Sequence, residues 1–338
     1  MAGNLKQVAN RAGVSLATAS RVLSGSDYPV SAELRERVLA VAAEMDYVPN
    51  AHARALIRGA QRTVGILVGE VGDPYFDAML NGAHRVATEE SCLVTIVSTG
   101  RDPEKELEGF RLMQSHGSTI IVVAGSGLHD PAYQEALSAR IRSFTGRTVL
   151  MGRHALDEGA SAIRVEADNV GAGRMLGEHL REHGHRHVGV ISGSGRVTST
   201  GDRIEGLAQG LGFRPQVLEV PATRDGGYEA TARLLEGQHD LTAIVGTADQ
   251  MAIGALAYCA DHGISVPHDL SVAGCNDIWV GRELTPSLTT VHIPLEEMGA
   301  AALRLALRDD VRSTVQSFPV QLVVRNSTGP SPDLTPSA

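Results

Sequence analysis

The chain opens with apolar residues that recur at the spacing of an amphipathic α-helix. In the first stretch the residues at i, i+3, i+4 and i+7 are all apolar: Leu5, Val8, Ala9 and Ala12. This spacing places them on one face of a helix. Asn4 is a typical helix N-cap, and Gly13 can end the helix because glycine adopts the left-handed conformation that a tight turn needs.

A second and a third helix are predicted directly afterwards. Ser15 can cap the second helix, whose inward face is formed by Ala19, Val22 and Leu23. Ser31 starts the third helix, which carries an apolar stripe at Leu34, Val38, Val41 and Met45. Two short helices joined by a tight turn are typical of a helix-turn-helix, which places its second helix in the DNA major groove. An ordinary pair of packed helices with a solvated outer face is the alternative.

The outer face of the second predicted helix supplies candidate DNA contacts. Arg21 can bond guanine O6 and N7 in a bidentate way, which is worth roughly 1–3 kcal/mol of discrimination. Leu16 and Ala17 can only touch a thymine methyl group or exclude a wrong base. Ser15 and Thr18 are placed to meet phosphates.

Residues 50–56 follow Pro49 and read as a short basic helix capped by Asn50 and carrying Arg54. So short a helix is not stable alone, so we expect it to form only on DNA and against a second copy of the chain. Leu56 can then wedge between base pairs in the minor groove and kink the duplex. Asn50, Arg54 and Leu56 are therefore candidate DNA contacts, and a plain interdomain linker is the alternative.

From residue 63 onward, apolar runs alternate with amphipathic stretches. This rhythm is typical of a parallel sheet covered by helices on both faces. In the first series we expect strands at 63–69, 92–98, 119–124 and 148–151, where the series ends, and helices at 77–90 and 104–116. In the second series we expect strands at 187–192, 217–220, 242–246 and 270–274, and helices at 170–183, 202–211, 227–236 and 249–262. Two doubly wound units predict a cleft between them, with ligands bound beyond the carboxyl ends of the strands.

Length and charge are consistent with this division. The 338 residues suffice for two or three domains. The formal net charge of −9 excludes a protein that is basic throughout. Residues 1–62 nevertheless contain 8 Lys and Arg against 5 Asp and Glu, whereas the rest contains 22 against 34. A mildly basic head on an acidic body fits a DNA-binding module attached to a sensor.

Several features argue for a cytoplasmic protein without catalytic chemistry. The N-terminus lacks the apolar segment of a signal peptide, and no apolar run is long enough to cross a membrane. Cys92, Cys259 and Cys275 have no metal-ligand spacing, and we expect buried free thiols. The His-rich segment 183–187 lies at a predicted helix-to-strand turn, so we expect no metal and no cofactor. The acidic residues of 101–108 read as a solvated helix start, and no catalytic set appears in a plausible order.

The order of motifs resembles the LacI/GalR family of bacterial transcription regulators over essentially the whole chain. In the head the matching segments are 8–15, 20–25, 30–31, 35–38, 47–50 and 53–56. In the body they include 73–76, 168–169, 178–180, 184–185, 251–255, 266–267, 269–272, 285–290 and 296–299. The resemblance implies an N-terminal all-α helix-turn-helix head plus an α/β periplasmic-binding-protein-like core of two doubly wound parallel-sheet subdomains.

The resemblance also implies a domain plan. The expected parts are the helix-turn-helix head at 1–48, a hinge helix and linker at 49–62, a core N-subdomain at 63–165 plus 291–318, a core C-subdomain at 166–290 plus 319–328, and a disordered tail at 329–338. The chain is then expected to cross between the subdomains near Val165, Thr290 and Phe318.

A member of this family is expected to be a homodimer that binds palindromic double-stranded operator DNA, with Leu56 of each subunit at its centre. Its core closes on a small-molecule effector, and closure changes operator affinity, so we expect a repressor under effector control. Whether the effector releases the protein from DNA or drives it on is open. The alternative is a periplasmic-type small-molecule binding protein without a gene-regulatory role, against which the head and the missing export signal argue.

By the same resemblance, the effector contacts are expected at Tyr75, Phe76, Ser126, Arg153, Arg203, Tyr228, Ala248 and Asn276. Arg203 matches an arginine that grips the effector, and Tyr228 matches an aromatic residue that stacks on sugar rings or bases. The family often has Asn in place of Ala248, and its sugar-binding members often have Asp in place of Asn276. These departures weaken a sugar assignment without excluding it, and they favour an anionic effector that Arg153 and Arg203 could pair with.

Overall fold

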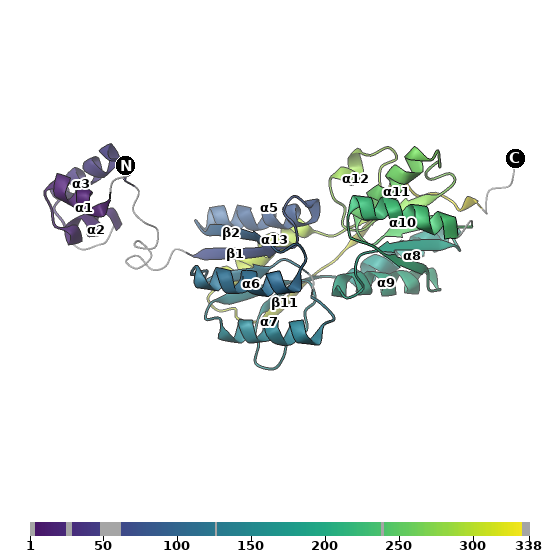
Figure 1. The fold of residues 1–338 in the computed structure, drawn as a ribbon, viewed down its shortest axis with the longest axis horizontal. Coiled ribbons are helices and arrows are strands. Elements are labelled where there is room, and N and C mark those ends of the chain that lie inside the picture. The colour runs from purple at the N-terminus through teal and green to yellow at the C-terminus, as the bar shows by residue number, and fades with distance from the viewer. Residues whose placement is uncertain (1–3, 25–28, 48–61, 126, 238–239, 333–338) are drawn as a thin grey trace. The chain divides into compact units, whose positions relative to one another are not determined.

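The computed structural model describes residues 4–24, 29–47, 62–125, 127–237 and 240–332 (Figure 1). Its contacts divide the chain into two compact units, residues 1–63 with 91–93 and residues 64–90 with 94–338. We call the first unit the head and the second unit the core. In the described residues, no helix is both long and apolar enough to span a bilayer.

The described head consists of three helices: α1 (Leu5–Ala12), α2 (Leu16–Ser24) and α3 (Ala32–Glu44). The expected start and end of α1 are confirmed. The Asn4 side chain accepts from the Gln7 backbone N–H at 2.9 Å, and the Gln7 side chain accepts from the Asn4 backbone N–H at 2.9 Å. Gly13 ends α1 in the left-handed conformation, with φ 65°.

All three helices contribute to one small apolar core in the head. Its buried members are Val8, Ala9, Ala12, Ala19, Val22, Val38 and Ala42. Of the stripe expected on α3, Val38 is buried and Val41 and Met45 pack half-buried against this cluster, which also includes Ala42. Small side chains let the short helices approach closely, and they leave the outer face of α2 to solvent.

The first sheet of the core is parallel, with strand order β11-β5-β4-β3-β1-β2. Its strands are β1 (Thr63–Val68), β2 (Leu93–Ser98), β3 (Ile120–Val123), β4 (Arg147–Met151), β5 (Ile163–Ala167) and β11 (Thr314–Phe318). The expectation that the series ends at 151 is wrong, because β5 and β11 extend the sheet beyond β4. β5 alternates apolar and charged residues and β11 is mostly polar, unlike the apolar runs of β1 and β3.

Helices cover both faces of this sheet. They are α5 (Pro74–Glu89), α6 (Pro103–Ser115), α7 (Pro131–Ser143) and α13 (Leu295–Leu307). Figure 1 shows α5 and α13 on one side and α6 and α7 on the other. The α5–α13 contact is so close that a Cβ added at Gly82 would lie 1.8 Å from the Glu296 carbonyl oxygen. Residues 82 and 299 are therefore positions where only glycine permits this packing.

The second sheet is also parallel, with strand order β7-β6-β8-β9. Its strands are β6 (Val188–Ser192), β7 (Gln216–Glu219), β8 (Ala243–Gly246) and β9 (Ser271–Ala273), close to the predicted segments. Its helices are α8 (Asn169–Glu182), α9 (Thr198–Leu211), α10 (Arg224–Gly237), α11 (Asp249–Asp261) and the short α12 (Val280–Glu283). In Figure 1, α8 and α9 lie together, as do α10 and α11.

Three connections join the two sheets. The chain passes from β5 into α8, returns from β10 (Thr290–His292) into α13, and passes again from β11 to β12 (Gln321–Val323). β10 and β12 pair antiparallel as a separate two-stranded ribbon. The two lobes are thus joined by three connecting segments, and a ligand cleft can lie between them. We call the lobe of the first sheet the N-subdomain and the lobe of the second sheet the C-subdomain.

Candidate DNA interface and ligand cleft

The outer face of α2 presents the expected DNA-contacting side chains. Ser15, Leu16, Ala17 and Arg21 are exposed, and Leu16 is 52% exposed although it is apolar. The Ser15 hydroxyl accepts from the Thr18 backbone N–H at 3.0 Å, so it caps α2 and orients its first turn. The opposite face is buried in the head core. The remaining expected DNA contacts, Asn50, Arg54 and Leu56, lie outside the described residues.

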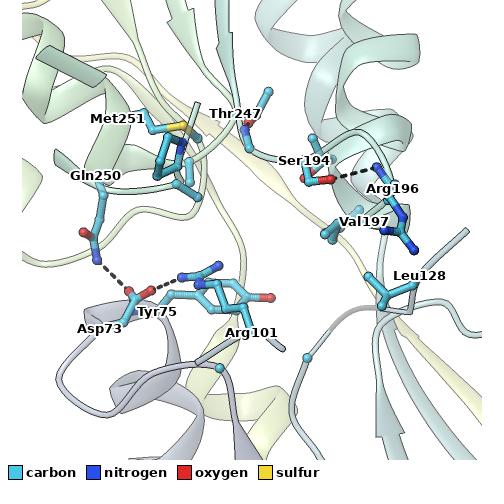
Figure 2. Close-up of a pocket in the computed structure, with 18 of the residues that line it drawn as sticks. Asp73, Tyr75, Arg101, Leu128, Ser194, Arg196, Val197, Thr247, Gln250 and Met251 are labelled. Atoms are coloured by element: carbon cyan, nitrogen blue, oxygen red, sulfur yellow. Dashed lines mark hydrogen bonds and ion pairs between the residues drawn. The ribbon is translucent and has the colours of Figure 1, made fainter. Parts of the chain in front are cut away.

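A cavity of about 640 Å³ lies between the two lobes of the core, and Figure 2 shows part of its lining. Its walls come from loops that follow the carboxyl ends of strands in both sheets. The N-subdomain contributes residues within 69–76, 99–106 and 125–133, and the C-subdomain contributes residues within 193–203, 219–222, 247–251 and 276–278. This is the position expected for a ligand site between doubly wound sheets. We call this cavity the cleft.

One wall of the cleft is organised around the Asp73 carboxylate, whose side chain is only 6% exposed. It caps α5 by accepting from the Tyr75 backbone N–H at 3.0 Å. Its other oxygen pairs with Arg101 Nη2 at 2.5 Å. Gln250 of the opposite lobe donates to it at 2.8 Å (Figure 2). The Arg101 guanidinium lies 5.3 Å from the centre of the Phe76 ring, within cation–π range.

Arg203 lies in the floor of the cleft and is 8% exposed. Its Nε donates to the Asn169 side-chain oxygen at 2.8 Å, and its Nη1 donates to the Thr247 carbonyl oxygen at 2.7 Å. Burial raises the pKa of Tyr75, and the charges of Arg203 and Arg101 oppose that rise. The phenol of Tyr75 therefore stays protonated and lies within electrostatic reach of two guanidinium groups.

Asn276 borders the same cavity and is buried. Within the described part of the chain, its side-chain oxygen has no hydrogen-bond partner. Its backbone takes φ 129°, a conformation unusual for a residue other than glycine. Unsatisfied buried polar atoms are rare in folded proteins, so this amide oxygen is a polar group beside the cleft that the described residues leave unpaired.

Another part of the lining is formed by Glu106 and Tyr133. The Tyr133 hydroxyl donates to the Glu106 carboxylate. Burial raises the pKa of Glu106 to about 7, while the bond from Tyr133 opposes the rise. The expectation that the acids of 101–108 form a solvated helix start is therefore wrong for Glu106, whereas Asp102 caps the start of α6 as expected, and both residues line the cleft.

The expected effector residues divide into two groups. Those that line the cleft are Tyr75, Phe76, Arg203, Ala248 and Asn276. Arg153 and Tyr228 do not line it, and Ser126 lies outside the described residues.

Arg153 and Tyr228 have other partners in the structure. Arg153 pairs with Asp202 at 2.5 Å. Tyr228 lies in the second turn of α10, packs edge-on against Tyr258 at 5.2 Å and donates to Asp261 at 3.1 Å. Near Tyr228, the loop between β7 and α10 lines the cleft through Ala222. In this arrangement neither side chain is part of the cavity lining, and the effector role of Arg153 and Tyr228 stays a prediction.

Sequence reasoning missed Arg101, Glu106 and Gln250 as lining residues. The available signal was position, since all of them lie in loops or first helical turns after a strand. Two of them, Arg101 and Gln250, meet at Asp73 only because the fold brings the loops together.

The cysteines and histidines flagged in the sequence have structural surroundings. Cys259 and Cys275 are buried, as expected, and burial raises the pKa of each thiol to about 11. Cys92 is only half-buried, so the expectation is wrong for that residue. His185 of the segment 183–187 is buried and bonds to the Thr242 hydroxyl at 2.9 Å and to the Gly329 carbonyl oxygen at 3.0 Å, which ties the C-terminal segment to the C-subdomain.

Comparison with known proteins agrees with this architecture. Residues 4–50 match the family described as bacterial regulatory proteins, lacI family. Residues 178–328 match the periplasmic binding protein-like domain. The Lac repressor dimer bound to operator and the anti-inducer ONPF superposes with a TM-score of 0.82 at 22% identity, covering 97% of this chain and all of that one. The expected fold class is therefore confirmed.

Relatives that align with about nine-tenths of the chain are HTH-type transcriptional regulators. The HTH-type transcriptional regulator GalS of Salmonella typhimurium is 33% identical over 311 residues, 90% of this chain and 89% of that protein. GalR of Escherichia coli is 32% identical over 315 residues, again 90% of this chain and 89% of that protein. The structure of the regulator CelR with cellobiose is 26% identical, with a TM-score of 0.70 over 96% of this chain and 99% of that one. The chain belongs to the lacI family of bacterial regulatory proteins and is a DNA-binding transcriptional regulator.

Proposed function

We propose that this regulator is a repressor that binds a palindromic operator as a homodimer, and that a small polar effector bound in the cleft sets its operator affinity. The observation that carries the proposal is the cleft itself: a 640 Å³ cavity shared by two lobes, with buried polar groups facing it. Such a cavity suits a ligand that bridges the lobes and so favours one arrangement of them.

The head supplies the DNA-reading part of the proposal. Arg21, Leu16 and Ala17 lie on the exposed face of α2, where a helix-turn-helix contacts base edges. Asn50, Arg54 and Leu56 are assigned to the operator centre from the sequence pattern alone. A protein that acts on chromosomal DNA works in the bacterial cytoplasm, and we propose that location together with the absence of enzymatic activity and of a cofactor.

Structures of relatives support both kinds of ligand in this proposal, operator DNA and a small effector. The Lac repressor structure holds operator and ONPF, and the CelR structure holds cellobiose. Those ligands are properties of those proteins. For this chain they favour a sugar or a sugar-derived molecule as the effector class. The proposed domain plan keeps the head at 1–48, the hinge and linker at 49–62, and the two core lobes. The disordered tail expected at 329–338 is wrong for residues 329–332, because Ser331 is buried and its backbone N–H donates to the His183 carbonyl oxygen at 2.8 Å.

The decisive experiment selects DNA from a random library with the purified full-length protein, and then measures operator affinity with and without candidate effectors. A selected palindrome whose affinity changes with one effector supports the proposal, and the direction of the change decides between inducer and corepressor. Failure to prefer any palindrome over random DNA contradicts it.

A variant pair separates the two sites. Arg203→Gln is expected to retain operator binding and to lose the effector response, because Arg203 borders the cleft and belongs to the core rather than the head. Arg214→Gln is the matched control, since Arg214 is 83% exposed in its side chain and pairs with Glu205 on the surface. A normal effector response in Arg203→Gln would remove the cleft from the proposal.

A further inference from the structure

Glu106 is a carboxyl group of the cleft whose two oxygens have different surroundings. It lies in α6 and lines the cleft together with Tyr133 of α7, whose buried hydroxyl donates to Oε1. Oε2 faces Gly125, just after β3, and a Cβ built on Gly125 would lie 3.4 Å from it. Beyond the chain neighbours of Gly125, no other described atom lies within 4 Å of that position. Oε2 therefore borders open space in the cleft.

The other carboxylates that line the cleft have donors that stabilise the ionised form. Asp73 pairs with Arg101. Asp102 accepts from two backbone N–H groups at the start of α6, and Glu219 accepts from a backbone N–H at 3.0 Å. Among the described residues, Glu106 has only a neutral phenol as its donor. Its charge is therefore the least compensated of the four.

The cations of the cleft are engaged with other groups. Besides Glu106, the charged residues that border the cavity are Asp73, Arg101, Asp102, Arg196, Arg203 and Glu219. Arg101 pairs with Asp73, and Arg196 pairs with Asp130 at the start of α7. In the described part of the chain, no cation lies within ion-pair distance of Glu106.

Burial without a counter-charge keeps a proton on Glu106 near neutral pH. Burial raises its pKa to about 7, and the bond from Tyr133 only opposes that rise. Since Oε1 accepts from Tyr133, the proton lies on Oε2, the oxygen that borders the open space. The protonated side chain is thus a hydroxyl donor directed into the cleft.

We propose that Glu106 contacts the effector as a neutral carboxylic acid, donating a hydrogen bond from Oε2 to an effector oxygen, so that effector binding is coupled to pH. The matching ligand is a polyhydroxy compound that places a hydroxyl or ring oxygen at this wall. This inference rests on the proposed function, because it takes the cleft as the effector site. A ligand that closes the cleft also removes water from Glu106, which further disfavours its ionised form.

Effector affinity is then expected to fall as pH rises. When only the protonated form binds, the apparent dissociation constant equals the intrinsic value divided by the protonated fraction. A group with a pKa of about 7 is about 90% protonated at pH 6 and about 9% protonated at pH 8. The affinity is therefore expected to fall about tenfold between these values, and binding at pH 7 to take up about half a proton.

The test uses the purified full-length protein and four polyhydroxy probes: D-ribose, D-galactose, D-glucose and cellobiose. A rise in melting temperature at pH 6 selects the probe, and isothermal titration calorimetry gives its dissociation constant from pH 6 to pH 8. Titrations at pH 7 in two buffers of different ionisation enthalpy count the protons taken up. An affinity that is constant or rises with pH overturns the proposal, because a ligand that donates to Glu106 favours the ionised form. Absence of binding by all four probes at pH 6 overturns it as well.

Glu106→Gln is the decisive variant, because a neutral amide resembles the protonated carboxyl. Its oxygen can accept from Tyr133 and its NH₂ group can donate to the effector. We expect Glu106→Gln to retain at pH 8 the affinity that the wild type has at pH 6. Glu106→Leu lacks the donor and is expected to bind at least tenfold more weakly at pH 6.

Glu108→Gln is the matched control on the same helix, since the Glu108 side chain is 59% exposed, and it should keep the wild-type pH profile. Circular dichroism and the melting temperature establish that each variant is folded. A folded Glu106→Gln protein with the wild-type pH profile contradicts the proposal, as does a Glu106→Leu protein that binds as tightly as the wild type.

The same variant separates Glu106 from other groups that titrate. Burial raises the pKa of Asp249 to about 6, but its oxygens accept from Thr290 at 2.6 Å and from the Ile278 backbone at 2.8 Å. A contribution from Asp249, or from His129 beside the lining residue Leu128, persists in Glu106→Gln. The part of the pH dependence that disappears in this variant therefore belongs to Glu106.

Operator binding distinguishes this inference from the proposed function. If a ligand changes operator affinity equally at pH 6 and pH 8, the regulator is effector-controlled and the role of Glu106 as a donor fails. If no palindrome is selected at all, the proposed function fails, whatever the cleft binds.

Discussion

Gln250 Nε2 donates a 2.8 Å hydrogen bond to Asp73 Oδ1 across the cleft (Figure 2). Asp73 caps α5 in the N-subdomain, and Gln250 lies in the first turn of α11 in the C-subdomain. The carboxylate that receives this bond is nearly buried and is also held by Arg101. The bond therefore couples the separation of the lobes to a fixed charge at the ligand site.

Gln250→Ala is expected to loosen this coupling. The loss of one hydrogen bond to a charged group costs about 1.5 kcal/mol, which corresponds to roughly a tenfold loss of effector affinity if the bond forms only in the closed arrangement. Calorimetric titration of the bound effector measures the change. Gln209→Ala is the control, because Gln209 bonds to Glu205 on the exposed surface of α9. Equal affinities in the two variants would show that the contact does not contribute to closure.

Glu106 is expected to make stability fall as pH rises. Its pKa is raised from 4.5 to about 7, so between those values the native state binds more protons than the unfolded state does. The stability associated with protonated Glu106 is present below pH 4.5 and is lost as pH rises to 7. Glu106→Gln removes this titration, so its free energy of unfolding should exceed that of the wild type by about 1–3 kcal/mol at pH 8 and by little at pH 4.5.

Urea unfolding of both proteins at several pH values tests the Glu106 prediction. Glu108→Gln is the matched control on the same helix, where Arg111 lowers the pKa of the Glu108 carboxyl and the expected sign is opposite. A difference between wild type and Glu106→Gln that does not change with pH would contradict the prediction.

Arg21→Ala is expected to relax base preference at one position in each operator half-site. The exposed position of Arg21 on α2 allows a bidentate contact to guanine, worth roughly 1–3 kcal/mol against a wrong base. Selection of binding sites from random DNA measures the preference at every position. An unchanged site profile would show that Arg21 does not read a base.

Leu56→Ala is expected to weaken specific operator binding far more than non-specific binding. The expectation follows from the sequence pattern, since a wedge that kinks the duplex acts only where the head pair is seated on its site. Fluorescence anisotropy with operator and with random DNA at one salt concentration measures both affinities. Similar losses on the two DNAs would contradict a wedge role.

Much of the fold was accessible from the sequence because it depends on local patterns. The helical spacing of Val8, Ala9 and Ala12 and the cap at Asn4 predicted α1, and continuous apolar runs predicted β1 and β3. Local patterns were insufficient for β5, which alternates apolar with charged residues, and for β11, which is mostly polar. Both resemble exposed segments until the two strands pair with each other in the sheet.

The ligand site, too, could be predicted from the sequence only in part. The rule that ligands bind at the carboxyl ends of strands predicts from the sequence alone that Tyr75, Ala248 and Asn276 lie near one another. It did not tell which way a helical side chain turns, and Tyr228 turns toward Tyr258 and Asp261.

The sequence by itself determined the order of the elements, the reading face of α2 and the existence of two lobes, because caps, periodicity and glycine turns act between neighbours in the chain. Only the tertiary structure decided that Arg203 lies buried with no carboxylate partner among the described residues and that Asp73 is shared between Arg101 and Gln250. Burial and electrostatic pairing depend on residues far apart in sequence, and the folded core alone brings them within contact distance.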